Sequence, residues 1–193
     1  MASIRTFVAI ELTEEALDAL GRLQERLKQA RGGGAGRWVR KEGIHLTLKF
    51  LGDVAEERVD EVCEAVRRAC EGHASFSVTI AGLGCFPHTR RPRVLWAGVE
   101  GEVDTLCALQ EAVEREMVAL GFPKERHPFT PHLTLARIHR EARAEDIRAL
   151  GQMADKASSE QIGGMRVDAV SVMKSDLRPT GAIYTELCCI PLG

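Results

Sequence analysis

The tetrapeptide His-Leu-Thr-Leu occurs twice in this chain, at residues 45–48 and at residues 132–135. The second copy follows the first by 87 residues. At average residue usage, a second copy arises by chance with a probability on the order of 1%. The duplicated motif therefore indicates an internal repeat, and a repeat constrains the fold more strongly than any single segment does.

The order of expected elements repeats at the same offset. Strand-like segments cover 4–12, 44–51 and 76–83, and helical periodicity covers the stretch from an N-cap at Thr13 to a glycine-rich loop at 32–36, and then 55–71. Shifted by 87 residues, the pattern recurs as a strand over 91–99, helices over 101–117 and 142–158, and a strand over 163–170. A last strand over 182–190 closes the chain.

These patterns predict an α+β fold in a single bilobal domain spanning 1–193. The two lobes are expected to be pseudo-symmetric α/β units, with repeats at roughly 4–90 and 91–190. Helices lie outside, and the strands lie on a shared sheet or on facing sheets around a central active-site groove. The sequence leaves the relative direction of the strands open.

The repeated motif presents two polar side chains on one face of each strand, because side chains alternate along a strand. In the first copy, Ile44, Leu46, Leu48 and Phe50 form an apolar face, which leaves His45, Thr47 and Lys49 on the other. In the second copy His132 and Thr134 point away from the core in the same way.

Two imidazoles and two hydroxyls meeting in one groove suit displacement at phosphorus. Imidazole titrates near neutral pH, so one ring can accept a proton while the other donates one. The threonine hydroxyls can donate hydrogen bonds to anionic oxygens. We therefore predict His45 and His132 as catalytic residues and Thr47 and Thr134 as phosphate-binding residues.

Composition and charge exclude several other classes. The net charge is −2 and the pI is about 6.3, which argues against strong non-specific binding of polyanions. The six cysteines form no CxxC pair and predict no disulfide framework, so we expect buried thiols in a reducing cytoplasm. No membrane segment or signal peptide is predicted, and no motif with metal-ligand spacing is present. We expect a monomer that needs no metal or cofactor.

The flanking residues identify a resemblance. The segments RTFVAIEL, WVRKEGIHLTLKFLGDV, RVLWAGV, PFTPHLTLAR and SDLRPTGAIYTEL, together with the two HLTL motifs, resemble the RNA 2′,3′-cyclic phosphodiesterases, also called 2′-5′ RNA ligases, of the two-histidine phosphoesterase superfamily. The resemblance covers nearly the whole chain. It implies mainly antiparallel sheets and metal-independent hydrolysis of a 2′,3′-cyclic phosphate on RNA or a nucleotide to a 2′-phosphate.

The resemblance also implies roles for individual residues. His45 would protonate the departing 3′-oxygen, and His132 would activate water. Thr47 and Thr134 would hold the non-bridging oxygens. Arg137 matches the family pattern HxTxxR as a phosphate ligand, and it reaches the site only past the strand's end or at a bulge, because strict alternation would bury it. Ligation through a 2′-5′ bond would run the same site in reverse.

The sequence leaves two roles open for several residues. Lys49 either adds positive charge beside His45 or is solvated. Phe7 and Trp38 are expected to pack in the core, with contacts to a nucleobase as the alternative. The basic loop 88–93 either guides RNA or connects the lobes.

Two other functions remain open. The same site could open cyclic phosphates on small nucleotides or ADP-ribose derivatives, and the chain could be a non-catalytic RNA-binding module. The physiological RNA is not specified by the sequence.

Overall fold

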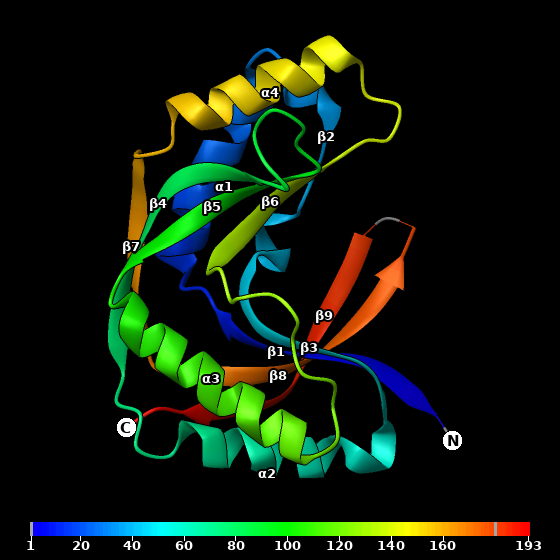
Figure 1. Cartoon of the computed structure of the whole chain (residues 1–193), viewed down its shortest axis with the longest axis vertical. Coiled ribbons are helices and arrows are strands. Elements are labelled where there is room, and N and C mark those ends of the chain that lie inside the picture. Colours follow the sequence, from blue (N-terminus) through cyan, green and yellow to red (C-terminus); the bar gives the residue numbers. More distant parts are fainter. Residues whose placement is uncertain (1, 180) are drawn as a thin grey trace.

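The computed structural model describes residues 2–179 and 181–193, and in that part of the chain nine strands form one sheet (Figure 1). The strands are β1 (Ser3–Glu11), β2 (Gly36–Trp38), β3 (His45–Ala55), β4 (Phe76–Phe86), β5 (Val94–Gly101), β6 (His132–Ile138), β7 (Gln161–Val167), β8 (Ala169–Arg178) and β9 (Gly181–Pro191). The helices are α1 (Glu14–Gln29), α2 (Val59–Cys70), α3 (Val103–Ala119) and α4 (Ala144–Lys156), with short 3-10 helices η1 (Gly33–Ala35), η2 (Lys41–Gly43) and η3 (Glu56–Arg58). The predicted α+β class is confirmed.

Apart from β2, the order of the strands is pseudo-symmetric about the centre of the sheet. Its order is β7-β4-β5-β6-β3-β1-β8-β9, with β2 added beside β6, and the pairings are antiparallel. β3 pairs with β6 at Leu46 and Leu133, which are themselves 87 residues apart. Residues at equivalent places in the sequence repeat thus face each other across the middle of the sheet.

Each half of the sheet combines strands from both halves of the sequence. β4, from the first repeat, pairs with β5 and β7 of the second. β8, from the second repeat, pairs with β1 of the first. The chain therefore crosses the middle of the sheet twice.

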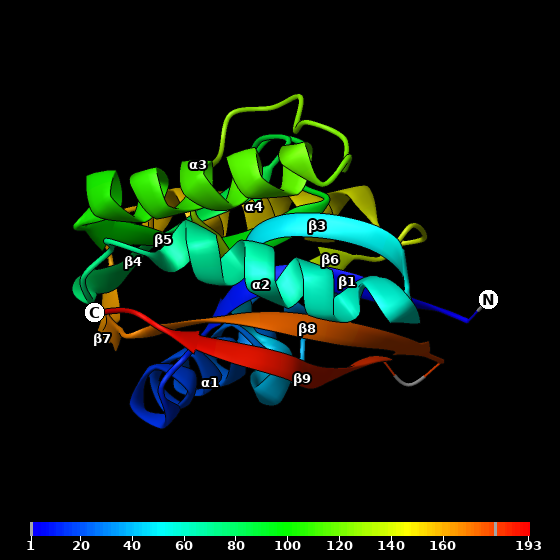
Figure 2. The same ribbon diagram turned by 90° about the horizontal axis from the view of Figure 1, so that it is seen from below.

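The helices cover the sheet in two pairs (Figures 1 and 2). α1 packs against β7 and α4 against β4, whereas α2 packs on β8 and β9 and α3 on β3. The main apolar core lies under these helices. Phe7, Ala9 and Met173 form a small second cluster that is separate from this core, and Tyr184 packs on it. Among the described residues, no helix is long and apolar enough to cross a membrane.

The late part of the sequence differs from expectation. The single strand predicted over 163–170 is two strands, β7 and β8, which are separated at Asp168. β7 lies at the edge beside β4 and β8 lies beside β1, so the chain changes halves of the sheet at this residue. The predicted N-cap is confirmed, because Thr13 Oγ1 accepts a hydrogen bond from the Ala16 amide at 3.3 Å.

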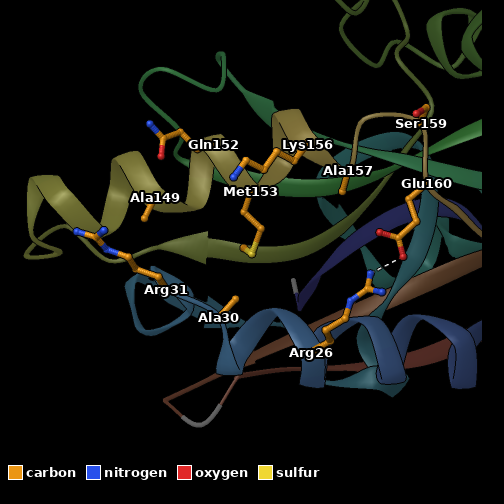
Figure 3. A pocket seen from close by; sticks show the side chains of 10 residues that line it. All are labelled: Arg26, Ala30, Arg31, Ala149, Gln152, Met153, Lys156, Ala157, Ser159 and Glu160. Atoms are coloured by element: carbon orange, nitrogen blue, oxygen red, sulfur yellow. Dashed lines mark hydrogen bonds and ion pairs between the residues drawn. The ribbon is translucent and has the colours of Figure 1, made fainter.

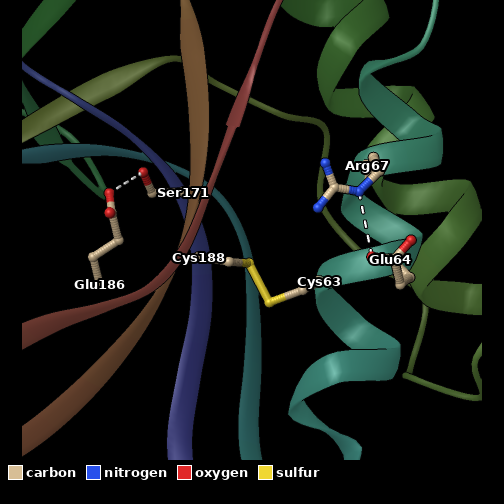
Figure 4. Close-up of a disulfide and its surroundings, with 6 residues drawn as sticks. All are labelled: Cys63, Glu64, Arg67, Ser171, Glu186 and Cys188. Atoms are coloured by element: carbon tan, nitrogen blue, oxygen red, sulfur yellow. Dashed lines mark hydrogen bonds and ion pairs between the residues drawn. A yellow bond between two sulfur atoms is a disulfide. The ribbon is translucent and has the colours of Figure 1, made fainter.

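A disulfide joins Cys63 of α2 to Cys188 of β9 (Figure 4). The expectation that the cysteines form no disulfide was wrong. The two residues are 125 positions apart, and only the packing of α2 on β9 brings them together, so their spacing in the sequence carried no signal. The four other cysteines are free: Cys70, Cys85, Cys107 and Cys189.

Candidate active site

The four residues of the predicted site lie on the two central strands. Leu46 pairs with Leu133, and continuing this antiparallel register by one residue in each direction sets His45 opposite Thr134 and Thr47 opposite His132. All four side chains are half-buried, whereas the alternating leucines are buried. Paired strands lie about 4.8 Å apart, so each imidazole has a hydroxyl as its neighbour across the strands. Opposed residues share a face of the sheet, called the site face below.

Both histidines are fixed by the backbone two residues earlier. The Nδ1 atom of His132 lies 2.7 Å from the carbonyl oxygen of Thr130, and His45 makes the equivalent hydrogen bond with the backbone of Gly43. A carbonyl oxygen only accepts, so Nδ1 of His132 carries a proton. The other nitrogen, Nε2, is then a base when the ring is neutral and an acid when it is charged.

Aromatic rings hold each imidazole in place. His45 stacks on Phe7 at 4.6 Å between ring centroids and meets the edge of Tyr184 at 4.9 Å. His132 meets Phe86 at 4.8 Å and Trp96 at 6.2 Å. Loss of hydration lowers the pKa of His45 to about 4, against a smaller opposing effect of its hydrogen bond to Gly43. His45 is therefore neutral at pH 7 in the free protein.

A β-bulge brings Arg137 onto the site face. The register between β5 and β6 pairs Leu95 with Ala136 but Trp96 with Thr134, so Leu135 is passed over. Leu135 and Ala136 are both buried, and the alternation resumes one residue later with Arg137 exposed. The expectation that Arg137 needs a bulge to leave the core agrees with this backbone.

An equivalent bulge lies in β3 and contradicts the simple alternation expected there. Val8 pairs with Lys49 and Ala9 with Thr47, so Leu48 is passed over. Phe50 is consequently 62% exposed, and it lies 5.9 Å from Phe7 between ring centroids on the site face. The predicted apolar face including Phe50 was wrong at this position.

The same bulge turns Lys49 into the core. Its Nζ atom donates to the carbonyl oxygen of Pro123 at 2.7 Å and forms an ion pair with Glu114 of α3 at 2.8 Å. Lys49 is 5% exposed, so both expectations for it, a charge beside His45 and a solvated side chain, were wrong. Its charge is compensated inside the protein.

Two buried glutamines brace the two bulges. Gln24 of α1 donates from Nε2 to the carbonyl oxygens of Leu135 at 3.0 Å and Val39 at 2.9 Å. Gln110 of α3 donates to the carbonyl oxygen of Leu48 at 3.3 Å. Each helix thus supports the irregular residue of one central strand. The sequence signal, a lone glutamine on the apolar side of a helix, is recognisable only once the bulges are known.

Tyr184 and Glu11 were missed by sequence reasoning. Burial raises the pKa of Tyr184, and the positive charges of Arg137 and Arg5 oppose this increase, which puts both arginines within electrostatic reach of the phenol. Glu11 pairs with His45 across β1 and β3, and burial together with the charge and hydrogen bond of Glu186 raises its pKa. A carboxyl group thus lies beside His45.

The indole of Trp96 also faces the predicted site. Trp96 pairs with Thr134, and its Nε1 atom is buried without a hydrogen-bond partner in the described structure. The ring lies over Gly84, where an added Cβ atom would come within 2.2 Å of it. Only glycine at position 84 therefore leaves room for the indole, whose ring is tilted by 59° to that of His132.

Trp38 packs against the main core as expected, whereas Phe7 is buried in the separate cluster on the site face and stacks on His45, so its contact with a nucleobase stays a prediction. Phe7 is 2% exposed, and the indole nitrogen of Trp38 donates to the carbonyl oxygen of Gly33 at 3.0 Å. The loop 88–93 carries its three arginines exposed beside α4, where the carbonyl of Thr89 occupies the space of a Cβ atom at Gly151. Guidance of RNA by this loop stays a prediction.

A hollow of about 630 Å³ lies between α1 and α4 (Figure 3). Figure 3 shows Met153 extending toward Ala30 at the end of α1 and an ion pair between Arg26 and Glu160 at one end of the hollow. Neither His45 nor His132 lines this hollow. The candidate site is instead built on the open face of the two central strands.

Comparison with known proteins identifies the family of the chain. The family model of the LigT like Phosphoesterase matches the chain twice, over residues 10–96 and 98–184. An RNA 2′,3′-cyclic phosphodiesterase from Methanothermobacter thermautotrophicus is 37% identical over 95% of this chain and 96% of its own. A protein of the same name from Thermotoga maritima is 38% identical, over 95% of this chain and 93% of the relative.

Solved structures give the same result. The crystal structure of TT0787 from Thermus thermophilus superimposes with a TM-score of 0.78 at 30% identity, covering 98% of both chains. E. coli LigT in complex with 3′-AMP has the same TM-score at 24% identity, covers 99% of both chains, and supports the fold alone. With both halves matched by one model and near full-length relatives above 30% identity, this chain belongs to the LigT-like phosphoesterase family.

Proposed function

We propose that this protein hydrolyses the 2′,3′-cyclic phosphate at the end of an RNA or on a nucleotide and leaves a 2′-phosphate. The pairing of Leu46 with Leu133 is the observation that carries the proposal, because it sets one imidazole and one hydroxyl of each repeat beside those of the other. The activity named for the relatives at 37% and 38% identity is the same reaction class.

In the proposed mechanism, Nε2 of neutral His132 takes a proton from water as the water oxygen attacks phosphorus. The bond from phosphorus to the 3′-oxygen breaks, and that oxygen takes a proton from Nε2 of charged His45. Thr47, Thr134 and Arg137 stabilise the negative charge on the non-bridging oxygens. Transfer of a proton between the rings or with solvent restores the starting state.

The low pKa of His45 fits this role only with substrate bound. In the free protein a pKa of about 4 leaves the ring neutral at pH 7. The anionic phosphate beside the ring favours its charged form, so binding of substrate raises the pKa of His45 and favours protonation of the ring. Expulsion of water by the substrate strengthens this attraction.

The experiment is turnover of a 2′,3′-cyclic nucleotide by the purified chain, with identification of the product. We expect a 2′-phosphate, loss of at least about 100-fold in kcat for His45→Ala and for His132→Ala, and full activity for His73→Ala, which lies after α2. A 3′-phosphate would reverse the leaving group. Binding without turnover by the unmutated chain would instead support a non-catalytic RNA-binding module.

Metal independence, a monomeric state, a cytoplasmic location and reversal to 2′-5′ ligation remain predictions. Activity that survives a chelator is the expected result, because the side chains assembled here are imidazoles, hydroxyls and a guanidinium. Ligation is tested with an RNA ending in a 2′,3′-cyclic phosphate and a second RNA that carries a 5′-hydroxyl.

A further inference from the structure

Two arginines face each other next to the candidate site. Arg37 of β2 is the cross-strand partner of Arg137 of β6. Side chains that are directly opposed in an antiparallel pair lie on the same face, with Cβ atoms about 4.5–5.5 Å apart. Both arginines are exposed. Arg37 therefore lies on the site face together with Arg137.

In the part of the chain that the structure describes, no acid pairs with either of these two like charges. Among the described residues, neither Arg37 nor Arg137 takes part in a salt bridge. Like charges directly opposed across strands are unfavourable, and paired guanidinium groups are well suited to phosphate oxygens. The arrangement is therefore that of an anion site whose anion comes from outside the protein.

The backbone that carries Arg37 is firmly held. The Val39 amide donates to the carbonyl oxygen of Leu135 at 2.9 Å, and the His139 amide donates to that of Ala35 at 2.8 Å. Gln24 adds a hydrogen bond to the carbonyl oxygen of Val39. Arg37 thus extends from a strand that is fixed at both ends, which lowers the entropy lost when it binds a ligand.

The position of Arg37 relative to the histidines selects the ligand. β2 and β3 lie in succession along the same edge of β6, since Trp38 pairs with Ala136 and Leu46 pairs with Leu133. Arg37 consequently lies beyond His45, farther from the centre of the sheet. A 2′,3′-cyclic phosphate occupies the 3′ end of a strand, so any further phosphate of the substrate lies on its 5′ side.

We propose that Arg37 binds the phosphate on the 5′ side of the terminal nucleotide, next to the cyclic phosphate that Arg137 contacts in the proposed mechanism. This inference rests on the proposed function of the histidine site. The ligand is either the internucleotide phosphodiester of an RNA or the 5′-phosphate of a mononucleotide. In the other repeat the residue equivalent to Arg137 is Phe50, so this pair of arginines marks one side of the site and gives the substrate strand a direction.

The test compares three substrates on Arg37→Gln: a nucleoside 2′,3′-cyclic phosphate, its 5′-phosphorylated form, and a dinucleotide that ends in a 2′,3′-cyclic phosphate. Arg148→Gln is the matched control, because Arg148 is exposed on α4 and makes no salt bridge in the described structure. We expect Arg37→Gln to lower kcat/KM about tenfold for the dinucleotide and to leave the nucleoside substrate unchanged. A loss on the 5′-phosphorylated mononucleotide identifies a terminal phosphate as sufficient, and a loss confined to the dinucleotide identifies the phosphodiester.

The salt dependence supplies a second readout. Loss of one phosphate contact should make the slope of log(kcat/KM) against log[salt] shallower by about 0.7 for the dinucleotide. Arg148→Gln should keep the slope of the unmutated protein. An equal loss on all three substrates, or no loss on either substrate with a second phosphate, would overturn the proposal.

A binding experiment separates this proposal from the proposed function. Fluorescence anisotropy gives the affinity for a labelled dinucleotide that ends in a 2′-phosphate, whether or not the protein turns over any substrate. We expect about tenfold weaker binding by Arg37→Gln. Inactivity of the unmutated protein with weaker binding by the variant contradicts only the proposed hydrolysis, and equal affinities contradict the role of Arg37.

Discussion

The side-chain amide of Gln24 donates a hydrogen bond to the carbonyl oxygen of Leu135 at 3.0 Å, although 111 residues separate the two in the chain. This contact ties α1 to the bulge that turns Arg137 onto the site face. Gln110 makes the equivalent contact with Leu48 in β3. The outer helices thus help to set the position of residues on the far face of the sheet.

Gln24→Leu should lower both stability and activity. The substitution removes the side-chain donor from the partly buried carbonyl oxygen of Val39 and from the buried carbonyl oxygen of Leu135, which costs about 2 kcal/mol in the free energy of unfolding. Loosening of the bulge should also lower kcat/KM through Arg137. Denaturant unfolding and kinetics measure the two effects, and Gln29→Leu, on the exposed end of α1, should leave both within error. Full activity in a destabilised Gln24→Leu protein would show that the bulge does not need this contact.

The pH dependence of the reaction should report the low pKa of His45. With protons on both imidazoles no base remains, so kcat/KM, which reflects the free protein, should fall as the pH drops through about 4, the pKa of His45. The bound phosphate raises this pKa, so the acid limb of kcat should lie at a higher pH. An acid limb of kcat/KM near pH 6 to 7, typical of a hydrated imidazole, would contradict the burial argument.

Stability should follow the same group with a defined sign. The folded state holds His45 neutral, whereas the unfolded chain binds a proton below about pH 6.5. Stability contributed by this group is therefore lost as the pH falls from 6.5 to about 4. The difference in free energy of unfolding between pH 7 and pH 4.5 should be smaller in His45→Ala than in the unmutated protein.

Removal of Lys49 should be more harmful than removal of its ion pair. Lys49→Met leaves Glu114 buried opposite no cation, which should cost about 3–5 kcal/mol. The double variant Lys49→Met with Glu114→Leu removes both charges and should recover most of that loss. Urea unfolding of the two single variants and the double variant measures the coupling. Additive losses in the double variant would show that the two charges do not interact.

The disulfide should stabilise the fold by linking distant parts of the chain. It closes a separation of 125 residues, for which the chain-entropy model gives about 4–5 kcal/mol. Cys63→Ser or a reductant should lower the melting temperature, whereas Cys189→Ser, at an exposed free cysteine, should not. A melting temperature that does not change when reductant is added would contradict a stabilising disulfide between Cys63 and Cys188.

The sequence predicted the order of most elements and the exposed face of each HLTL motif, because helical and strand periodicities are local properties, but it predicted neither β2 nor the break between β7 and β8. It also led to the correct requirement that Arg137 leave the core by an irregularity, since a buried arginine needs a partner. The prediction failed at Phe50 and Lys49, because β3 has a bulge equivalent to the one before Arg137 in β6, and strict alternation does not hold across it. A lysine on a strand reads as exposed until its partner Glu114 is known.

Other features depend on packing between distant segments. Arg37, Tyr184 and Glu11 join the site through the pairings of β2, β9 and β1, which no spacing in the sequence specifies. The bond between Cys63 and Cys188 has the same origin. Residues that lie on the motif itself are therefore the predictable part of the site, and residues contributed by neighbouring strands are the unpredictable part.

The crossing of β4 and β8 into opposite halves of the sheet means that the two repeats are entwined. In a polypeptide cut at residue 90, the first piece would contain β4 without its partner β5 and β1 without its partner β8. Neither piece alone contains both strands of these pairs, whereas the two pieces together do. Co-expressed fragments should consequently rebuild the site only by assembling with each other, and two copies of one fragment could dimerise by the same exchange.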